Sequence, residues 1–70
     1  MAKEVSVKTS TGTYLYKISE YNGTYYCYKW KDSLFGSWND IGKARSMEDA
    51  LSLIKSHARK YGSVYSVNIN

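Results

Sequence analysis

Asn22-Gly23 is the feature that most constrains how this chain folds. The dipeptide separates two tyrosine-rich runs, residues 13–21 and 24–31, and each run is short enough to be a single strand. A two-residue type I′ turn needs positive φ at both central positions, and asparagine followed by glycine adopts this conformation with little strain. The sequence therefore predicts a tight β-hairpin in which Tyr21 lies opposite Thr24.

The turn also sets the register of the hairpin. The opposed pairs are then Tyr21–Thr24, Ile18–Cys27, Lys17–Tyr28 and Leu15–Trp30. Successive side chains of a strand point to opposite sides of the sheet, so these pairs divide between two faces. One face carries Tyr14, Tyr16, Ile18, Tyr25 and Cys27, with Lys29 and Lys31 at its end; the other carries Leu15, Lys17, Tyr26, Tyr28 and Trp30.

The pattern on either side of the hairpin predicts further strands. Apolar residues alternate over residues 3–8, which indicates a strand that a turn at residues 10–12 joins to the hairpin. Residues 32–36 are expected to form a loop, and residues 37–45 an irregular segment with short strand pieces near Trp38 and over residues 43–45. Residues 63–69 alternate as a last strand, with Tyr65, Val67 and Ile69 on one face and Val64 on the other.

One helix is predicted between these strands, over residues 47–61. Ser46 is followed three residues later by Asp49, a pattern typical of a helix N-cap, and acidic residues in the first turn suit the helix dipole. Gly62 is expected to end the helix. Its apolar face consists of Ala50, Leu53, Ile54, His57, Ala58 and Tyr61.

The element order is therefore β-β-β, a short irregular or β piece, then α-β. It predicts an α+β fold in a single domain, residues 1–70, in which a small antiparallel sheet of three to five strands carries one helix across one face. A three-stranded sheet followed by a helix capped at Ser46 resembles in outline the DNA-binding domains at the start of tyrosine recombinases. That resemblance implies that the sheet could read a DNA groove.

A single helix covers only one of the two aromatic faces. We expect it to cover the face with Ile18 and Cys27, because that face has an aliphatic residue and a thiol at its centre. The other face stays open unless residues 32–45 fold over it, with Leu34, Phe35 or Trp38 as the cap. An uncovered apolar patch of this kind usually marks an interaction site.

Reactive side chains are sparse. Cys27 is the single cysteine, so no internal disulfide forms, and a small chain without disulfides is expected in a reducing compartment, here the cytoplasm. His57 is the single histidine, and no spacing of His, Cys, Asp or Glu indicates a metal site. No nucleotide motif and no apolar stretch of membrane-spanning length occurs. We therefore expect no catalysis, cofactor, metal or membrane contact.

The charge favours an anionic partner. The net charge is +4, and residues 1–31 carry five lysines against two glutamates. Cations beside aromatic rings are typical of nucleic-acid-binding surfaces. The candidate binding residues are Lys17, Tyr26, Tyr28, Lys29, Trp30, Lys31, Trp38, Lys43 and Arg45.

Eight tyrosines and two tryptophans suit protein interfaces equally well. The alternative hypothesis is therefore a protein-binding inhibitor or adapter, of the kind that phages and mobile elements encode, or a homodimer joined through the open face.

The turn can be tested directly. We expect Gly23→Val to lower the free energy of unfolding by about 1 kcal/mol or more, because a β-branched residue resists positive φ. Urea denaturation measures the loss. Thr13→Val, which places the same side chain in a predicted strand, serves as the control. Equal stability of the Gly23→Val variant and the native chain would contradict the type I′ turn.

Overall fold

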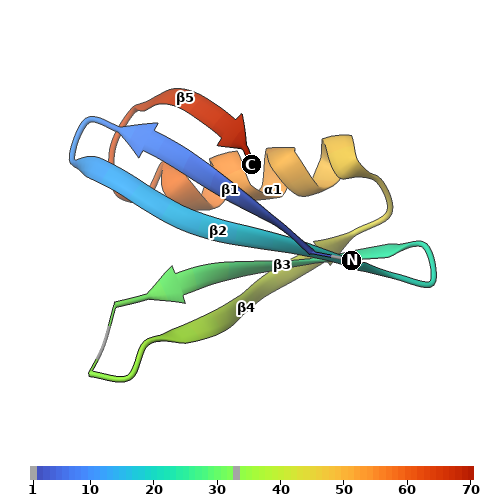
Figure 1. Ribbon diagram of the computed structural model, residues 1–70. Helices are drawn as coiled ribbons and strands as arrows, with labels where there is room; N and C mark the ends of the chain where they lie inside the picture. The colour runs from blue at the N-terminus through green and yellow to red at the C-terminus, as the bar shows by residue number, and fades with distance from the viewer. Residues whose placement is uncertain (1, 33) are drawn as a thin grey trace.

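A computed structural model of the chain describes residues 2–32 and 34–70. It contains five strands and one helix: β1 (Ala2–Thr9), β2 (Gly12–Tyr21), β3 (Thr24–Lys31), β4 (Ser37–Ala44), α1 (Met47–Ala58) and β5 (Val64–Ile69). The strands form one sheet in the order β4-β3-β2-β1-β5, and every neighbouring pair is antiparallel (Figure 1). This confirms the predicted α+β class, and the sheet has five strands, at the upper end of the predicted range.

The hairpin forms as the turn residues predict. Asn22 and Gly23 have φ of 50° and 77°, the left-handed values that a type I′ turn requires. The β2–β3 pairing runs from Tyr21–Thr24 to Tyr16–Lys29 and includes Ile18–Cys27 and Lys17–Tyr28. The predicted Leu15–Trp30 pair lies one residue beyond the end of this ladder.

The helix begins where the sequence indicates but ends earlier. The Ser46 hydroxyl accepts the Asp49 backbone N–H at 3.1 Å, so the N-cap is confirmed. The prediction that the helix continues to residue 61 is wrong, because α1 ends at Ala58. The residues after α1 form a turn, in which the Tyr61 N–H donates to the Ala58 carbonyl, three residues earlier, at 2.9 Å. The Thr11 hydroxyl binds the Tyr61 carbonyl at 2.6 Å, which turns the chain back toward the sheet.

Residues 37–45 are more regular than predicted. Ser37–Ala44 is a continuous strand, β4, paired with β3 over its length. The register shifts between Cys27 and Tyr28, where Cys27 lies opposite Gly42 and Tyr28 opposite Asp40. This bulge breaks the two-residue alternation by which a strand is recognised in a sequence, and it explains why the pattern indicated an irregular segment.

A second register shift corrects the predicted faces of β5. Between Lys8 and Thr9 the β1–β5 ladder slips by one residue, so that Val64 lies opposite Thr9. Val64 and Val67 therefore both pack against the core, whereas Tyr65 is 66% exposed. The prediction that Val64 points away from Val67 is wrong for this reason.

The core lies between α1 and one face of the sheet. The side chains buried in it are Val5, Val7, Tyr16, Ile18, Cys27, Ala50, Ile54 and Ala58. The helix thus covers the face with Ile18 and Cys27, as expected, and lies on one side of the strands in Figure 1.

We expect Ile54→Ala to lower the free energy of unfolding by ~2–5 kcal/mol, because Ile54 is fully buried and its truncation leaves a cavity. Chemical denaturation measures this value. Leu34→Ala is the matched control, since Leu34 is 91% exposed and its truncation opens no cavity. A loss under ~0.5 kcal/mol for Ile54→Ala would place the packing face of the helix elsewhere.

Candidate functional site

The face of the sheet opposite α1 is uncovered. No helix or strand among residues 2–32 and 34–70 packs over it. Paired residues share a face of the sheet, and the pairs Lys17–Tyr28, Tyr28–Asp40, Trp30–Trp38 and Tyr26–Lys43 all lie on this side. We call these residues the open face: Lys17, Tyr26, Tyr28, Trp30, Trp38, Asp40 and Lys43.

Three of the four aromatic rings of the open face contact another ring or a lysine. Trp30 and Trp38 meet edge to face, with ring centroids 5.1 Å apart. The Lys17 ammonium lies 4.6 Å from the Trp38 ring centroid and 5.0 Å from that of Tyr28. These cation–π contacts hold the charge against the rings, so aromatic and basic groups form one continuous surface.

The loop at the end of the β3–β4 hairpin supports this surface without covering it. A Cβ on Gly36 would collide with the Trp30 indole, so the loop backbone packs directly against that ring. Leu34 and Phe35 are 91% and 92% exposed and therefore do not cap the open face, although the sequence offered them for that role. This end of the hairpin extends away from the helix (Figure 1).

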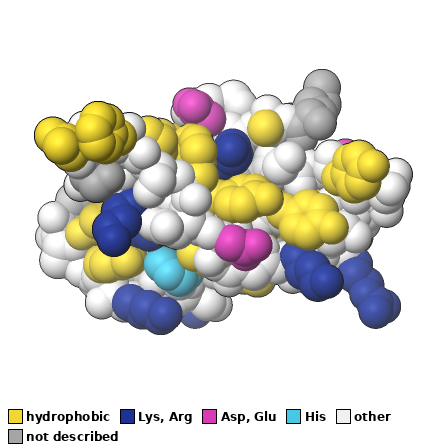
Figure 2. Space-filling view, turned by 90° about the horizontal axis from the view of Figure 1, so that it is seen from below, with side chains coloured by type: hydrophobic (Ala, Val, Ile, Leu, Met, Phe, Trp, Pro, Cys, Tyr) yellow, Lys and Arg dark blue, Asp and Glu magenta, His cyan; other side chains and the backbone are white. Residues whose placement is uncertain are grey.

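The charge of the open side is mixed. The β1–β2 register adds Glu4, opposite Lys17, and Lys8, opposite Thr13. The lysines on this side are thus accompanied by two acids, Glu4 and Asp40. Arg45 follows β4 and is exposed beside Thr24 and Lys43. Figure 2, a view from the side of β4 that also includes the histidine of the helix side, shows hydrophobic, basic and acidic side chains intermingled along this edge of the molecule.

Two predicted site residues lie on the helix side instead. The Lys29 ammonium lies 5.4 Å from the Tyr14 ring centroid and 5.1 Å from that of Tyr61, and it donates to the Trp30 carbonyl at 3.2 Å. Lys31 shares this side, because it is two residues further along the same strand. The candidate set therefore divides, as the register predicted, and Lys29 and Lys31 do not lie beside Lys17.

Lys29 belongs to an aromatic cluster at the end of the helix that the sequence did not indicate as a unit. Tyr14 and Tyr61 stack with centroids 4.6 Å apart, and the Tyr16 hydroxyl lies 2.9 Å from His57 Nδ1. The signal for this cluster was the spacing of two tyrosines on alternate strand positions and of His57 and Tyr61 one helical turn apart. We assign the cluster a packing role, because its rings contact one another.

Ionisation in this cluster follows from burial. Burial raises the pKa of the Tyr16 hydroxyl, and the nearby Tyr61 and Tyr14 raise it further. Burial likewise lowers the pKa of His57, with added repulsion from Lys60 and Lys29. Both shifts favour neutral side chains, and the Tyr16 hydroxyl and His57 Nδ1 share one hydrogen bond in that state.

Cys27 is not placed for nucleophilic chemistry. It is fully buried, and its thiol donates to the Ala50 carbonyl at 3.8 Å. Burial raises the pKa of this thiol, and Asp40 raises it further, so the thiol form is favoured. The described residues contain no group of three or more His, Cys, Asp or Glu side chains that could hold a metal ion. Within the same residues, no helix has the length and apolar character needed to cross a membrane.

Comparisons with models of protein families, with curated proteins and with solved structures found no match to this chain.

We expect the free energy of unfolding to decrease as the pH falls from 7.5 to 5.5. The pKa of His57 is lower in the folded chain than its ordinary value of 6.5, so the unfolded chain binds this proton more readily. The stabilisation is present above pH 6.5 and is lost as the pH falls through the lowered pKa. Urea denaturation at several pH values measures the slope, and His57→Gln should flatten it. Identical slopes for the variant and the native chain would contradict the assignment.

Proposed function

We propose that this chain is a non-enzymatic binding protein whose open face binds single-stranded nucleic acid. The observation that carries the proposal is the set of four rings, Tyr26, Tyr28, Trp30 and Trp38, on an uncovered sheet face with Lys17 held among them. Unpaired bases stack on aromatic side chains, at ~1–3 kcal/mol per base, and they do so with little dependence on sequence.

The lysines beside the rings supply the second requirement. A base stacked on a ring keeps its phosphate at the border of that ring, where a cation can approach it. Lys17 lies over Tyr28 and Trp38. Lys43 lies opposite Tyr26, and Arg45 follows two residues later, just after the end of β4. The net charge of +4 further attracts an anionic strand.

The remaining reactive groups support binding rather than catalysis. Cys27 is buried beneath the helix, and His57 is occupied by its contact with Tyr16. Neither side chain lies on the open face, where a bound molecule would meet it.

A protein partner is the second candidate, and the charge of the open side favours it. Glu4 and Asp40 offset part of the lysine charge, which leaves a surface richer in rings than in net charge. Tyrosine and tryptophan are enriched at the centres of protein interfaces, and charged residues are depleted there. An inhibitor, an adapter or a homodimer joined through this face would use the same rings.

We expect labelled single-stranded oligonucleotides to bind in fluorescence anisotropy, with affinity that falls steeply as salt rises because each neutralised phosphate releases counterions. Tyr28→Ala should weaken binding by ~1–3 kcal/mol through lost stacking. Lys17→Glu should weaken it and reduce the salt dependence. Lys60→Glu, which makes the same charge change at an exposed position after α1, is the matched control.

The test separates the two candidates. Equal loss for Lys60→Glu and Lys17→Glu would mean that net charge, and not the open face, determines binding. Absence of binding to single-stranded and duplex oligonucleotides at tens of micromolar protein and low salt would overturn the nucleic-acid proposal. The protein-partner candidate would then stand first.

A further inference from the structure

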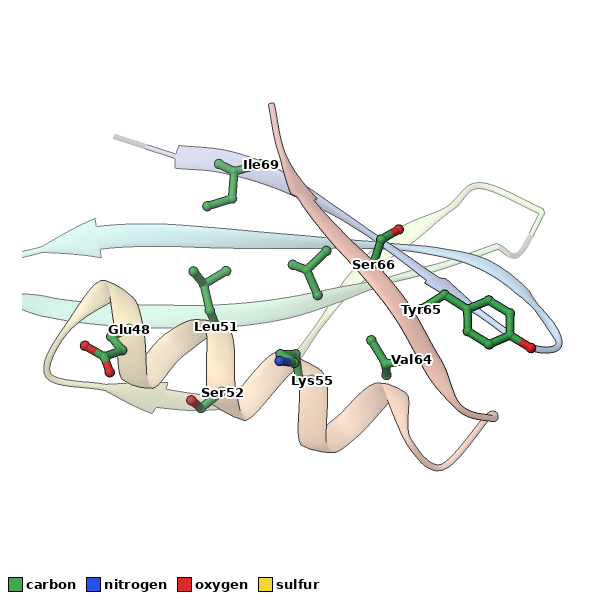
Figure 3. Close-up of a pocket in the computed structure, with 9 residues that line it drawn as sticks. Glu48, Leu51, Ser52, Lys55, Val64, Tyr65, Ser66 and Ile69 are labelled. Atoms are coloured by element: carbon green, nitrogen blue, oxygen red, sulfur yellow. The ribbon is translucent and has the colours of Figure 1, made fainter.

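A groove lies between α1 and β5, on the side of the sheet away from the open face. It has a volume of about 500 Å³. Its lining, drawn in Figure 3, consists of Glu48, Leu51, Ser52 and Lys55 from the helix and Val64, Tyr65, Ser66, Val67 and Ile69 from the strand. The apolar side chains form its interior, and the single acid and the single base of the lining both come from the helix.

The strand that borders this groove has an unpaired edge. β5 is the last strand of the sheet and pairs only with β1 among the described residues. The Asn70 N–H donates to the Glu4 carbonyl at 2.9 Å, so Asn70 directs its backbone groups toward β1. Backbone direction alternates along an antiparallel strand, and Val67 and Ile69 therefore direct their N–H and C=O groups outward.

The two edges of the sheet differ in how they discourage pairing. β4 carries charged Asp40 and Lys43, and charged side chains commonly protect an edge strand. Each edge ladder has one register shift, and the shift in β5 lies next to Val64, before the regularly paired residues 66–69. The segment 63–70 has the sequence SVYSVNIN, with no charged side chain and no proline. Ile69 is also 46% exposed, so β5 offers free backbone groups beside an apolar surface.

The helix contributes one acidic and one basic side chain to the groove, so this surface is complementary in charge to a second copy of itself. Glu48, Leu51, Ser52 and Lys55 form one stripe along α1, because residues three, four and seven positions apart share a face of a helix. A two-fold axis beside the middle of this stripe would reverse its direction in the second copy. Glu48 of one copy would then face Lys55 of the other, and the two Leu51 side chains would meet at the axis.

We propose that the occupant of this groove is a second copy of the chain, joined by antiparallel pairing of the two β5 edges around a two-fold axis. The outward groups of Val67 and Ile69 then extend the sheet across both copies, and the paired helices close the two grooves over one another. Symmetric dimers require a surface that is complementary to itself, and the Glu48–Lys55 stripe meets this requirement.

The dimer does not depend on the proposed function, but it would extend the surface available to it. An axis perpendicular to the sheet keeps both helices on one side and both open faces on the other. Two copies of the ring cluster would then lie on one continuous sheet surface, at opposite ends of the joined sheet.

Charge exchange on the stripe provides the test. Sedimentation equilibrium should give twice the monomer mass for the native chain at high micromolar concentration. Glu48→Lys and Lys55→Glu should each raise the dimer dissociation constant ~5- to 30-fold, because each replaces two attractive pairs with two repulsive ones. The double variant, with both changes, should restore the native constant to within about threefold. Glu20→Lys, at an exposed position outside the groove, should leave it unchanged.

Amide hydrogen exchange gives an independent measurement. The Val67 and Ile69 amides should exchange slowly at dimer concentrations and quickly on dilution, whereas the Asn68 amide, which faces β1, should stay protected throughout. A chain that remains monomeric to about millimolar concentration would overturn the proposal. So would a dimer that Tyr28→Ala dissociates while the charge exchanges leave it intact, because that dimer would use the open face. Loss of oligonucleotide binding without loss of the dimer would contradict the proposed function alone.

Discussion

The two-residue turn at Asn22 and Gly23 is the constraint on which the rest of the structure depends. Its left-handed backbone joins β2 and β3 without an extra residue, so each side chain of the hairpin has a defined partner and a defined face. Ile18 and Cys27 share the face that α1 covers, and Lys17 and Tyr28 share the other. A slip of one residue would turn one strand over relative to the other and place either Lys17 or Tyr28 beneath the helix.

The chain divides its aromatic residues between two uses. On the helix side, Tyr14, Tyr16 and Tyr61 pack with His57 and Lys29, and the hydroxyl groups of Tyr14 and Tyr16 form hydrogen bonds with Thr11 and His57. In a chain of only 70 residues, these rings enlarge the small core at the end of the helix, because an aromatic ring packs against apolar side chains while its polar group forms a hydrogen bond. On the other side, four rings share a sheet face over which no described helix or strand packs, and these rings are the basis of the proposed binding function.

The two edge strands of the sheet, β4 and β5, also differ in how available they are to a partner. The charges of β4 make that edge a poor partner for another strand, whereas β5 combines free backbone groups with an apolar groove beside the helix. The open face and the β5 groove lie on opposite sides of the sheet. A ligand on one and a second copy on the other would therefore not compete for the same residues.

The sequence by itself determined the elements whose signals are local. The Asn22-Gly23 turn, the Ser46 cap and the helical spacing of Ala50, Ile54 and Ala58 follow from the backbone preferences of a few adjacent residues. The same local register predicted that Lys17, Tyr26, Tyr28 and Trp30 share a face and that Lys29 and Lys31 do not. These inferences needed no knowledge of distant contacts, because a two-residue turn leaves only one way to align its strands.

Only the tertiary structure decided the features that depend on residues far apart in the chain. Both bulges lie in ladders that no two-residue turn aligns, and they changed the interpretation of residues 37–44 and of Val64. Beyond the end of α1, the Tyr61 carbonyl accepts a hydrogen bond from the Thr11 hydroxyl, a contact across 50 positions of sequence. The association of Trp38 with Trp30 and Lys17, and the groove beside β5, likewise come from the order in which strands pair. Strand order and bulges are settled by burial over the whole sheet, and no short stretch of sequence contains that information.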